Sequence, residues 1–313
     1  MLSDTFWETR LAWLRYLLAW LAYLGMRTIV WLPFRWQLAI GKAFGRAIYP
    51  FLGARRRIAE RNIEVCLPEV SPEQRHRLVR EHFAALGASI VEMSMGWFGS
   101  ERKIRELIRV EGAEHLQAAL ERGKGVILNG AHFTAFELFW PALKPLCTRL
   151  CGMYKWQRNP VMNRVMSRGR ARSYDVMIAN DDVRTMLRQL SQNSVAWYAA
   201  DQSYTGKSSA LLPFFGEPAM TNTALSRIAR ITGATVLPYF CRRLPDDSGY
   251  VMTIGAPLEG LPSGDEAEDT RRLMRVLEDQ IRVCPEQYWW IHKRFKSRPP
   301  PLPDLYAANR PAA

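Results

Sequence analysis

A histidine and a glutamate five positions apart, His132 and Glu137, are the residues of this chain best suited to acid–base chemistry. They follow an apolar run over residues 126–128, which predicts a buried strand, and a turn that contains Gly130. A carboxylate bonded to one imidazole nitrogen fixes the tautomer and raises the basicity of the other nitrogen. The segment therefore predicts a general base, His132, with Glu137 as its orienting partner; the alternative is a structural histidine.

A cluster of arginines lies further along the chain, in residues 159–172. Arg164, Arg168 and Arg172 recur at every fourth position and would share one face of a helix, whereas Arg170 points elsewhere. An arginine close to a catalytic base can bind a phosphate group or stabilise an oxyanion. The alternative for most of these residues is an ordinary solvated helix charge.

A third polar site begins at Asp201, directly after an apolar run over residues 194–200 that predicts another buried strand. The apolar segment 212–216 then either lines a tunnel for a hydrocarbon chain or belongs to the core. The sequence contains no Gly-x-Ser-x-Gly elbow, no P-loop and no Rossmann glycine fingerprint. These absences argue against serine hydrolases, NTPases and dehydrogenases.

These groups must be positioned by a chain of 313 residues with a formal net charge of +13. A balance this basic favours anionic partners, which include nucleic acid, an acidic membrane face and phosphorylated substrates. The 11 tryptophans and an apolar N-terminus favour the membrane over nucleic acid. The five scattered cysteines do not form a disulfide framework or a zinc-binding pattern, so we expect a reducing compartment and no metal.

The N-terminal segment 11–34 is almost entirely apolar and aromatic, interrupted by Arg15 and Arg27. As one helix it would extend roughly 36 Å, enough to cross a hydrocarbon core. It predicts a membrane-anchoring helix, spanning or monotopic; a buried core helix and a cleaved signal peptide are the alternatives. The basic residues that follow place the body of the protein in the cytoplasm and could bind anionic lipid headgroups. They are Arg35, Lys42, Arg46, Arg55, Arg56, Arg57 and Arg61.

The rest of the chain alternates between predicted helices and strands. Ser71 and Gln74 form a capping box around Pro72 and predict a long amphipathic helix that ends near Gly99. Strands are expected over residues 126–129, 194–200, 235–241 and 250–254, and helices over 181–190, 221–231 and 269–281. This alternation predicts an α/β domain over residues 111–306. Residues 1–36 form the expected anchor, 37–110 a helical membrane-proximal region and 307–313 a tail.

The ordered set of motifs resembles the bacterial lipid A biosynthesis acyltransferases, the lauroyl and myristoyl transferases related to the glycerolipid acyltransferases. The resemblance covers nearly the whole chain. Its motifs are Asn129-Gly130-Ala131-His132-Phe133 with Glu137, Asn159-Pro160 with Gly169-Arg170, Ala200-Asp201-Gln202-Ser203-Tyr204, Phe214-Phe215-Gly216, Thr232-Gly233-Ala234 with Pro238, and the segment 285–296.

The resemblance implies a glycerolipid-acyltransferase-like mixed sheet flanked by helices, attached to the cytoplasmic side of the inner membrane. It implies acyl transfer from acyl carrier protein to a hydroxyl of a lipid A precursor, without metal or cofactor. His132 would be the general base and Glu137 its partner, and Arg170 and Asp201 would bind substrate. The expected partners are acyl carrier protein, the precursor glycolipid and an anionic membrane surface, not nucleic acid. Acylation of another glycolipid or a lysophospholipid, or a tethered binding protein without catalysis, are the alternatives.

Overall fold

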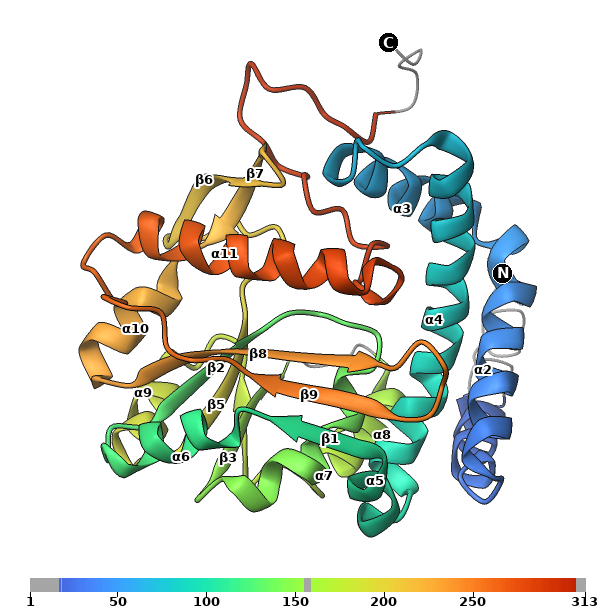
Figure 1. Cartoon of the computed structure of the whole chain (residues 1–313), viewed down its shortest axis with the longest axis horizontal. Helices are drawn as coiled ribbons and strands as arrows, with labels where there is room; N and C mark the ends of the chain where they lie inside the picture. Colours follow the sequence, from blue (N-terminus) through green and yellow to red (C-terminus); the bar gives the residue numbers. More distant parts are fainter. Residues whose placement is uncertain (1–16, 18, 155–158, 308–313) are drawn as a thin grey trace, which may run out of the picture.

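The centre of the molecule is a seven-stranded sheet in the order β1-β9-β8-β2-β5-β3-β4 (Figure 1). The computed structural model describes residue 17 and residues 19–154 and 159–307. Neighbouring strands are parallel except for β8 and β9, which are antiparallel, so the predicted mixed α/β sheet is confirmed. The strands are β1 (Ile108–Glu111), β2 (Val126–Gly130), β3 (Leu150–Tyr154), β4 (Val176–Ala179), β5 (Val195–Ala199), β8 (Thr235–Arg243) and β9 (Tyr250–Ile254), and β6 (Ser209–Phe214) and β7 (Glu217–Asn222) form a separate hairpin.

The central strands are buried on both faces of the sheet. In β2, Ile127 faces one hydrophobic core, whereas Val126 and Leu128 face the other. Strands covered on both sides need apolar residues at successive positions, which is why this segment reads as a continuous apolar run. The first core includes residues of α9 (Val183–Ser191), α10 (Ala224–Thr232) and α11 (Glu266–Val283), and the second includes residues of α6 (Ala113–Glu121) and α7 (Trp140–Leu143). Figure 1 shows α11 on one side of the sheet and α6 and α7 on the other.

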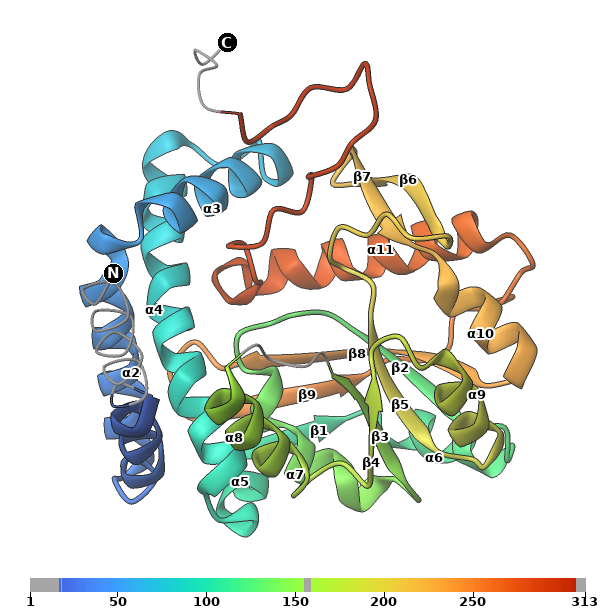
Figure 2. The ribbon, with the colours of Figure 1, turned by 180° about the vertical axis from the view of Figure 1, so that it is seen from behind.

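A long helix, α4 (Pro72–Phe98), stands beside the sheet, and α2 (Phe34–Ile48) lies on its outer side (Figures 1 and 2). The predicted capping box is confirmed: the Ser71 hydroxyl accepts from the Gln74 N–H, and the Gln74 side chain accepts from the Ser71 N–H. The remaining helices are α3 (Gly53–Cys66), α5 (Glu101–Leu107) and α8 (Pro160–Arg170). The end of α4 lies beside the loop after β2, so this helix helps to frame the candidate site.

The N-terminal segment 11–34 is not the single helix that its hydropathy predicts. Residues 11–16 and 18 lie outside the described part; the chain is helical over 19–29, turns over 30–32 and begins α2 after Pro33. Proline disfavours a helical conformation in the residue before it and lacks an N–H, so the helix breaks here. Within the described residues, every helix is too short or too polar to cross a lipid bilayer.

Glycines at the contact allow α2 to pack closely on α4. A Cβ atom on Gly45 would lie 2.0 Å from the Phe83 carbonyl oxygen. A Cβ atom on Gly87 would lie 2.1 Å from the Gly41 carbonyl oxygen. These neighbours are backbone atoms, which cannot move aside as a flexible side chain can. The glycines therefore fix the position of α2 and of the side chains that it turns outward.

Gly45→Ala is expected to lower the free energy of unfolding by at least about 1–3 kcal/mol, the usual cost of overpacking. Gly25→Ala is the matched control, because a Cβ atom there would have no neighbour within 4 Å. The control should leave stability unchanged or raise it slightly, since alanine favours helices. Denaturant unfolding of both variants tests this; equal stability of Gly45→Ala and wild type would contradict the close packing.

A buried histidine in α4 makes the fold sensitive to acid. His82 is 0% exposed, and its Nδ1–H donates a hydrogen bond to the Glu286 carbonyl oxygen at 3.0 Å. Burial lowers the pKa of His82 to about 4. Because this pKa lies below the value in the unfolded chain, the unfolded chain binds the extra proton between pH 6.5 and 4. His82 therefore contributes a loss of stability as the pH falls through that range.

His82→Gln keeps a donor for Glu286 but cannot take up a proton. The difference between the unfolding free energies at pH 7.5 and pH 4.5 should therefore shrink by roughly 2–3 kcal/mol in this variant. Denaturant titrations at the two pH values measure the difference. An undiminished acid loss in the variant would show that His82 is not its source.

Candidate active site

The histidine singled out by the sequence lies in the loop that follows β2. Gly130 ends the strand, and a Cβ atom there would lie 2.4 Å from the Trp197 indole nitrogen, so only glycine lets the two strands pack this way. The His132 ring packs edge-on against Phe136 and Trp197, with ring centroids 5.9 and 5.7 Å away. Its side chain is 27% exposed, which leaves it accessible to a substrate.

The carboxylate bonded to His132 is that of Asp201. Its Oδ1 lies 2.7 Å from His132 Nδ1, and its Oδ2 accepts from the His132 backbone N–H at 3.0 Å. The two residues follow β2 and β5, which are parallel neighbours. Because the carboxyl ends of parallel neighbours lie at the same edge of a sheet, residues 69 positions apart meet there. Asp201 therefore holds both the ring and the main chain of His132.

The hydrogen bond between His132 Nδ1 and Asp201 Oδ1 indicates which imidazole nitrogen carries the proton. A carboxylate can only accept, so Nδ1 carries the proton and Nε2 carries the lone pair of the neutral ring. Burial by itself lowers the pKa of His132, but the charge and hydrogen bond of Asp201 more than offset it, and the pKa is raised above its usual value. Burial likewise raises the pKa of Asp201, and His132 reverses that effect and lowers it. Asp201 therefore stays ionised and strengthens Nε2 as a base.

The expected bond between Glu137 and the His132 ring is not found, and this geometric expectation is wrong. Glu137 is buried in a short 3-10 turn, Phe136–Leu138, and accepts from Arg170 Nε at 2.9 Å. Its other oxygen accepts from the indole N–H groups of Trp97 and Trp140 at 3.4 and 3.3 Å. The segment after His132 is a loop, not the start of a regular helix, so the five-residue spacing does not bring the two side chains into a hydrogen bond.

Arg170 is the last residue of α8 and reaches inward to Glu137, away from the exposed Arg164 and Arg168. Arg172 lies beyond the helix and donates to the Trp97 carbonyl instead of sharing a face with the others. Both members of the Glu137–Arg170 pair influence the pKa of His132, the arginine lowering it and the glutamate raising it. The four predicted site residues thus form one cluster built from two pairs, His132–Asp201 and Glu137–Arg170.

The loop that carries His132 is held by the C-terminal segment 285–296, which was expected only as one of the family motifs. The Trp289 N–H donates to the His132 carbonyl at 3.0 Å, and the Thr134 N–H donates to the Gln287 carbonyl at 2.8 Å. Gln287 is itself fixed, because its side-chain amide exchanges hydrogen bonds of 2.7 and 3.1 Å with the backbone of Arg243. The polar and aromatic composition of segment 285–296 marks it as unusual, but the sequence does not show that it contacts the His132 loop and the backbone of Arg243.

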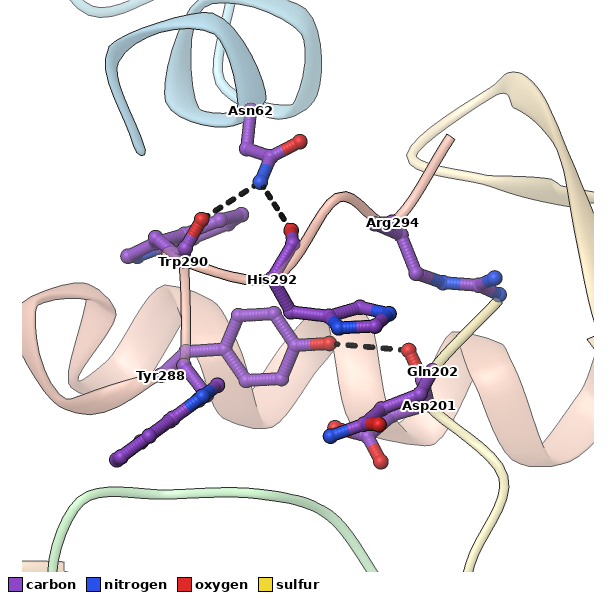
Figure 3. A pocket seen from close by; sticks show the side chains of 8 residues that line it. Asn62, Asp201, Gln202, Tyr288, Trp290, His292 and Arg294 are labelled. Atoms are coloured by element: carbon purple, nitrogen blue, oxygen red, sulfur yellow. Dashed lines mark hydrogen bonds between the residues drawn. The ribbon is translucent and has the colours of Figure 1, made fainter. Parts of the chain in front are cut away.

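Residues of the same C-terminal segment line a small cavity next to Asp201 (Figure 3). The Tyr288 hydroxyl donates a hydrogen bond to the Asp201 carbonyl at 3.5 Å, and the Asn62 side chain donates to the carbonyls of Trp290 and His292 at 2.6 and 2.8 Å. His292 Nε2 accepts from the Ser203 N–H, and burial lowers the pKa of His292 to about 4, so this ring is neutral. The cavity between these groups measures ≈ 10 Å³, room for about one water molecule.

The buried guanidinium group of Arg294 lines the same cavity. Arg294 is 3% exposed, donates to the Met220 carbonyl at 2.9 Å and to the Thr221 hydroxyl at 2.6 Å, and lies 4.9 Å from the centroid of the Phe214 ring. Its charge helps to lower the pKa of Asp201. Phe214 and its neighbour Leu212 belong to the core, which is the second of the two interpretations of that apolar run.

No group of three or more His, Cys, Asp or Glu side chains in the described part of the chain is arranged to hold a metal ion. The cysteines Cys66, Cys147, Cys151, Cys241 and Cys284 are free thiols. Burial raises the pKa of Cys147 to about 12, so this partly accessible thiol is not an activated nucleophile. The reactive group that the site offers is therefore the imidazole of His132.

A histidine held by a buried carboxylate at the ends of parallel strands, with an arginine close by, defines a general-base site on an α/β scaffold. Residues 6–297 match the family model of the bacterial lipid A biosynthesis acyltransferases. The chain is 35% identical over 291 residues to the lipid A biosynthesis palmitoleoyltransferase of Escherichia coli, covering 92% of this chain and 94% of the relative. It is 35% identical over 294 residues to the lauroyltransferase of the same organism, covering 93% and 95%, and 27% identical over 289 residues to its myristoyltransferase, covering 91% and 89%.

The chain belongs to the bacterial lipid A biosynthesis acyltransferase family. The resemblance seen in the ordered motifs is thereby confirmed, and the chain is an acyltransferase of lipid A biosynthesis.

Proposed function

We propose that this protein transfers a fatty acyl chain from acyl carrier protein to a hydroxyl group of a lipid A precursor. The observation that carries the proposal is the His132–Asp201 pair, which leaves Nε2 of a carboxylate-oriented imidazole available to a substrate hydroxyl. The acyl thioester is already activated, so the protein needs only to position it, deprotonate the acceptor and stabilise the oxyanion. No cofactor beyond the acyl carrier protein thioester is proposed.

In the proposed reaction, His132 Nε2 takes the proton of the acceptor hydroxyl as its oxygen attacks the thioester carbonyl. The tetrahedral intermediate collapses with cleavage of the carbon–sulfur bond, and the imidazolium returns the proton to the departing thiolate. Asp201 stays ionised and stabilises the imidazolium. Arg170, whose Nε and Nη2 bind Glu137, is proposed to direct its other amino group toward the oxyanion or a substrate phosphate.

The charge balance supports both proposed substrates. A chain with a formal net charge of +13 attracts the acidic acyl carrier protein and the phosphate groups of a lipid A precursor. The names of the relatives specify palmitoleoyl, lauroyl and myristoyl transfer for those proteins. For this chain we propose only the reaction class, secondary acylation of the lipid.

A membrane surface is proposed as the place where the two substrates meet. Of the seventeen large exposed hydrophobic side chains in the described part of the chain, eleven lie between residues 17 and 52. We call them the N-terminal apolar face: Leu17, Trp20, Leu21, Leu24, Trp31, Leu32, Trp36, Ile40, Phe44, Phe51 and Leu52. Tryptophan-rich faces of this kind favour the headgroup region of a bilayer. We propose monotopic attachment to the cytoplasmic side of the inner membrane; release of the protein from membranes by high salt alone would contradict it.

The test of the reaction is a panel of donors and acceptors with the purified full-length protein. Acyl carrier protein thioesters and acyl-coenzyme A thioesters are each supplied with a lipid A precursor or with a lysophospholipid, and His132→Ala protein sets the background. We expect acylated lipid A precursor from the carrier-protein thioester at a rate that the other combinations do not reach. A preference for the lysophospholipid or for the coenzyme A thioester would overturn the corresponding half of the proposal.

A further inference from the structure

A groove of ≈ 460 Å³ lies between the C-terminal end of α2 and the N-terminal half of α4. Its lining residues are Arg46, Glu73, His76, Arg77, Arg80 and Glu81. Within the described residues, none of these side chains is hydrogen-bonded to the four residues of the candidate active site. The groove is therefore a feature separate from the acyl-transfer chemistry, and it is large enough for a phosphate-bearing group.

The three arginines of this groove lack ion-pair partners among the described residues. Two nearby arginines do have carboxylate partners: Arg56 pairs with Glu60, and Arg75 with Glu64. Glu73, which also lines the groove, accepts a hydrogen bond from the Ser71 hydroxyl at 2.9 Å at the start of α4. The groove also contains two carboxylates, Glu73 and Glu81, but neither forms an ion pair with one of the three arginines among the described residues. The arginines therefore outnumber the carboxylates and keep donors free, an arrangement that fits an anion supplied from outside.

The position of the groove indicates the source of that anion. On α2, Trp36, Ile40 and Phe44 recur at every fourth position and form the outward stripe of the N-terminal apolar face. Arg46 follows this stripe in the last turn of the helix, and Phe51, which is 85% exposed, lies just beyond it. A helix with an aromatic apolar face and arginines along its flank lies in the plane of a bilayer, with its charges at the depth of the lipid phosphates.

We propose that this groove binds the phosphate group of an anionic bilayer phospholipid while the N-terminal apolar face rests among the acyl chains. The occupant is a lipid of the surrounding membrane, not the acylated substrate. The apolar face supplies affinity for any bilayer, and the groove adds selectivity for anionic headgroups. The inference goes beyond the acyl transfer proposed above, because lipid binding at this groove requires no turnover.

Sedimentation with vesicles tests the inference with the full-length protein. Wild type and the variant Arg46→Gln/Arg77→Gln/Arg80→Gln are mixed with phosphatidylcholine vesicles that contain or lack 30% phosphatidylglycerol. Each basic residue near an anionic surface strengthens binding about fivefold, so the variant should bind the anionic vesicles roughly 100-fold more weakly. Its binding to pure phosphatidylcholine should match that of wild type.

The matched control removes the same formal charge elsewhere, as Lys103→Gln/Arg184→Gln/Arg188→Gln on the exposed surfaces of α5 and α9. An equal loss of binding to anionic vesicles in the control would show that only net charge matters and would overturn the proposed lipid-binding role of the groove. Displacement of wild type from the vesicles by inorganic phosphate at matched ionic strength would identify a free-anion site instead. Unchanged vesicle binding together with weakened binding of acyl carrier protein would identify a protein-docking site.

Vesicle binding by His132→Ala protein separates this inference from the proposed function. We expect it to match wild type, because the groove does not depend on catalysis. If the donor and acceptor panel gave no product, the proposed function would fail while the vesicle result stood. If the groove variant sedimented like wild type, the inference would fail while the proposed function stood.

Discussion

Asp201→Asn is expected to lower kcat for acyl transfer by roughly 10³–10⁴-fold, an effect close to that of His132→Ala. The amide that replaces the Asp201 carboxylate can present an N–H to Nδ1, which favours the tautomer that carries its proton on Nε2. That tautomer has no lone pair directed at the substrate hydroxyl. Because the two residues act as a unit, the double variant should be little slower than either single variant. Single-turnover assays with saturating thioester measure the loss.

The pH dependence of the reaction provides a second readout of the same pair. Asp201 raises the pKa of His132, so the wild-type rate should increase with pH through a value above 6.5 and then level off. In Asp201→Asn the raising influence is lost while burial still lowers the pKa. The rising limb should therefore move to lower pH even though the maximum rate is far smaller.

The matched control is Asp279→Asn, which removes an exposed carboxylate from α11 and should leave both the rate and the pH profile unchanged. An Asp201→Asn enzyme that retained a rate within tenfold of wild type would rule out the aspartate as the orienting partner. The spacing-based assignment of Glu137 would then regain support.

Local sequence patterns correctly predicted those helices and strands that are determined by residues close together in the chain. The strand Tyr250–Ile254 has the predicted bounds, and the capping box at Ser71 starts α4 as expected. The helix expected over residues 221–231 begins only at Ala224, because Thr221 pairs with Ala210 in the hairpin of β6 and β7. The edge strands β1 and β4 have only four residues each, too few for a periodic pattern to stand out.

The pairing at the site could not be predicted from spacing, because it depends on the order of strands in the sheet. His132 and Asp201 meet only because β2 and β5 are neighbours. The histidine and the aspartate were each identified as site residues by their motifs, but their contact is a property of the tertiary structure. The prediction of one helix over residues 11–34 failed for a related reason. Hydropathy summed over the segment does not reveal that the first helix ends before Pro33 and that a second helix, α2, begins after it.

Glu137→Gln is expected to lower the free energy of unfolding by about 3–5 kcal/mol, because it leaves a buried guanidinium without its counter-charge. The Glu137 and Arg170 side chains are only 6% and 15% exposed, so water compensates poorly for the lost pair. Glu106→Gln is the matched control: it breaks the exposed pair with Arg102 and should cost less than about 1 kcal/mol. Denaturant unfolding measures both variants.

The double variant Glu137→Gln/Arg170→Gln separates the structural contribution of the glutamate from a catalytic one. Removing both charges should restore part of the stability lost in Glu137→Gln, because no unpaired charge stays buried. Activity should not return with stability if Arg170 stabilises the oxyanion or a substrate phosphate, since that group is now gone. A Glu137→Gln enzyme as stable as wild type yet inactive would contradict this interpretation and give the glutamate a direct part in catalysis. Glu137 in the His-x4-Glu spacing is thus expected to matter mainly by holding Arg170 beside a base that Asp201 orients.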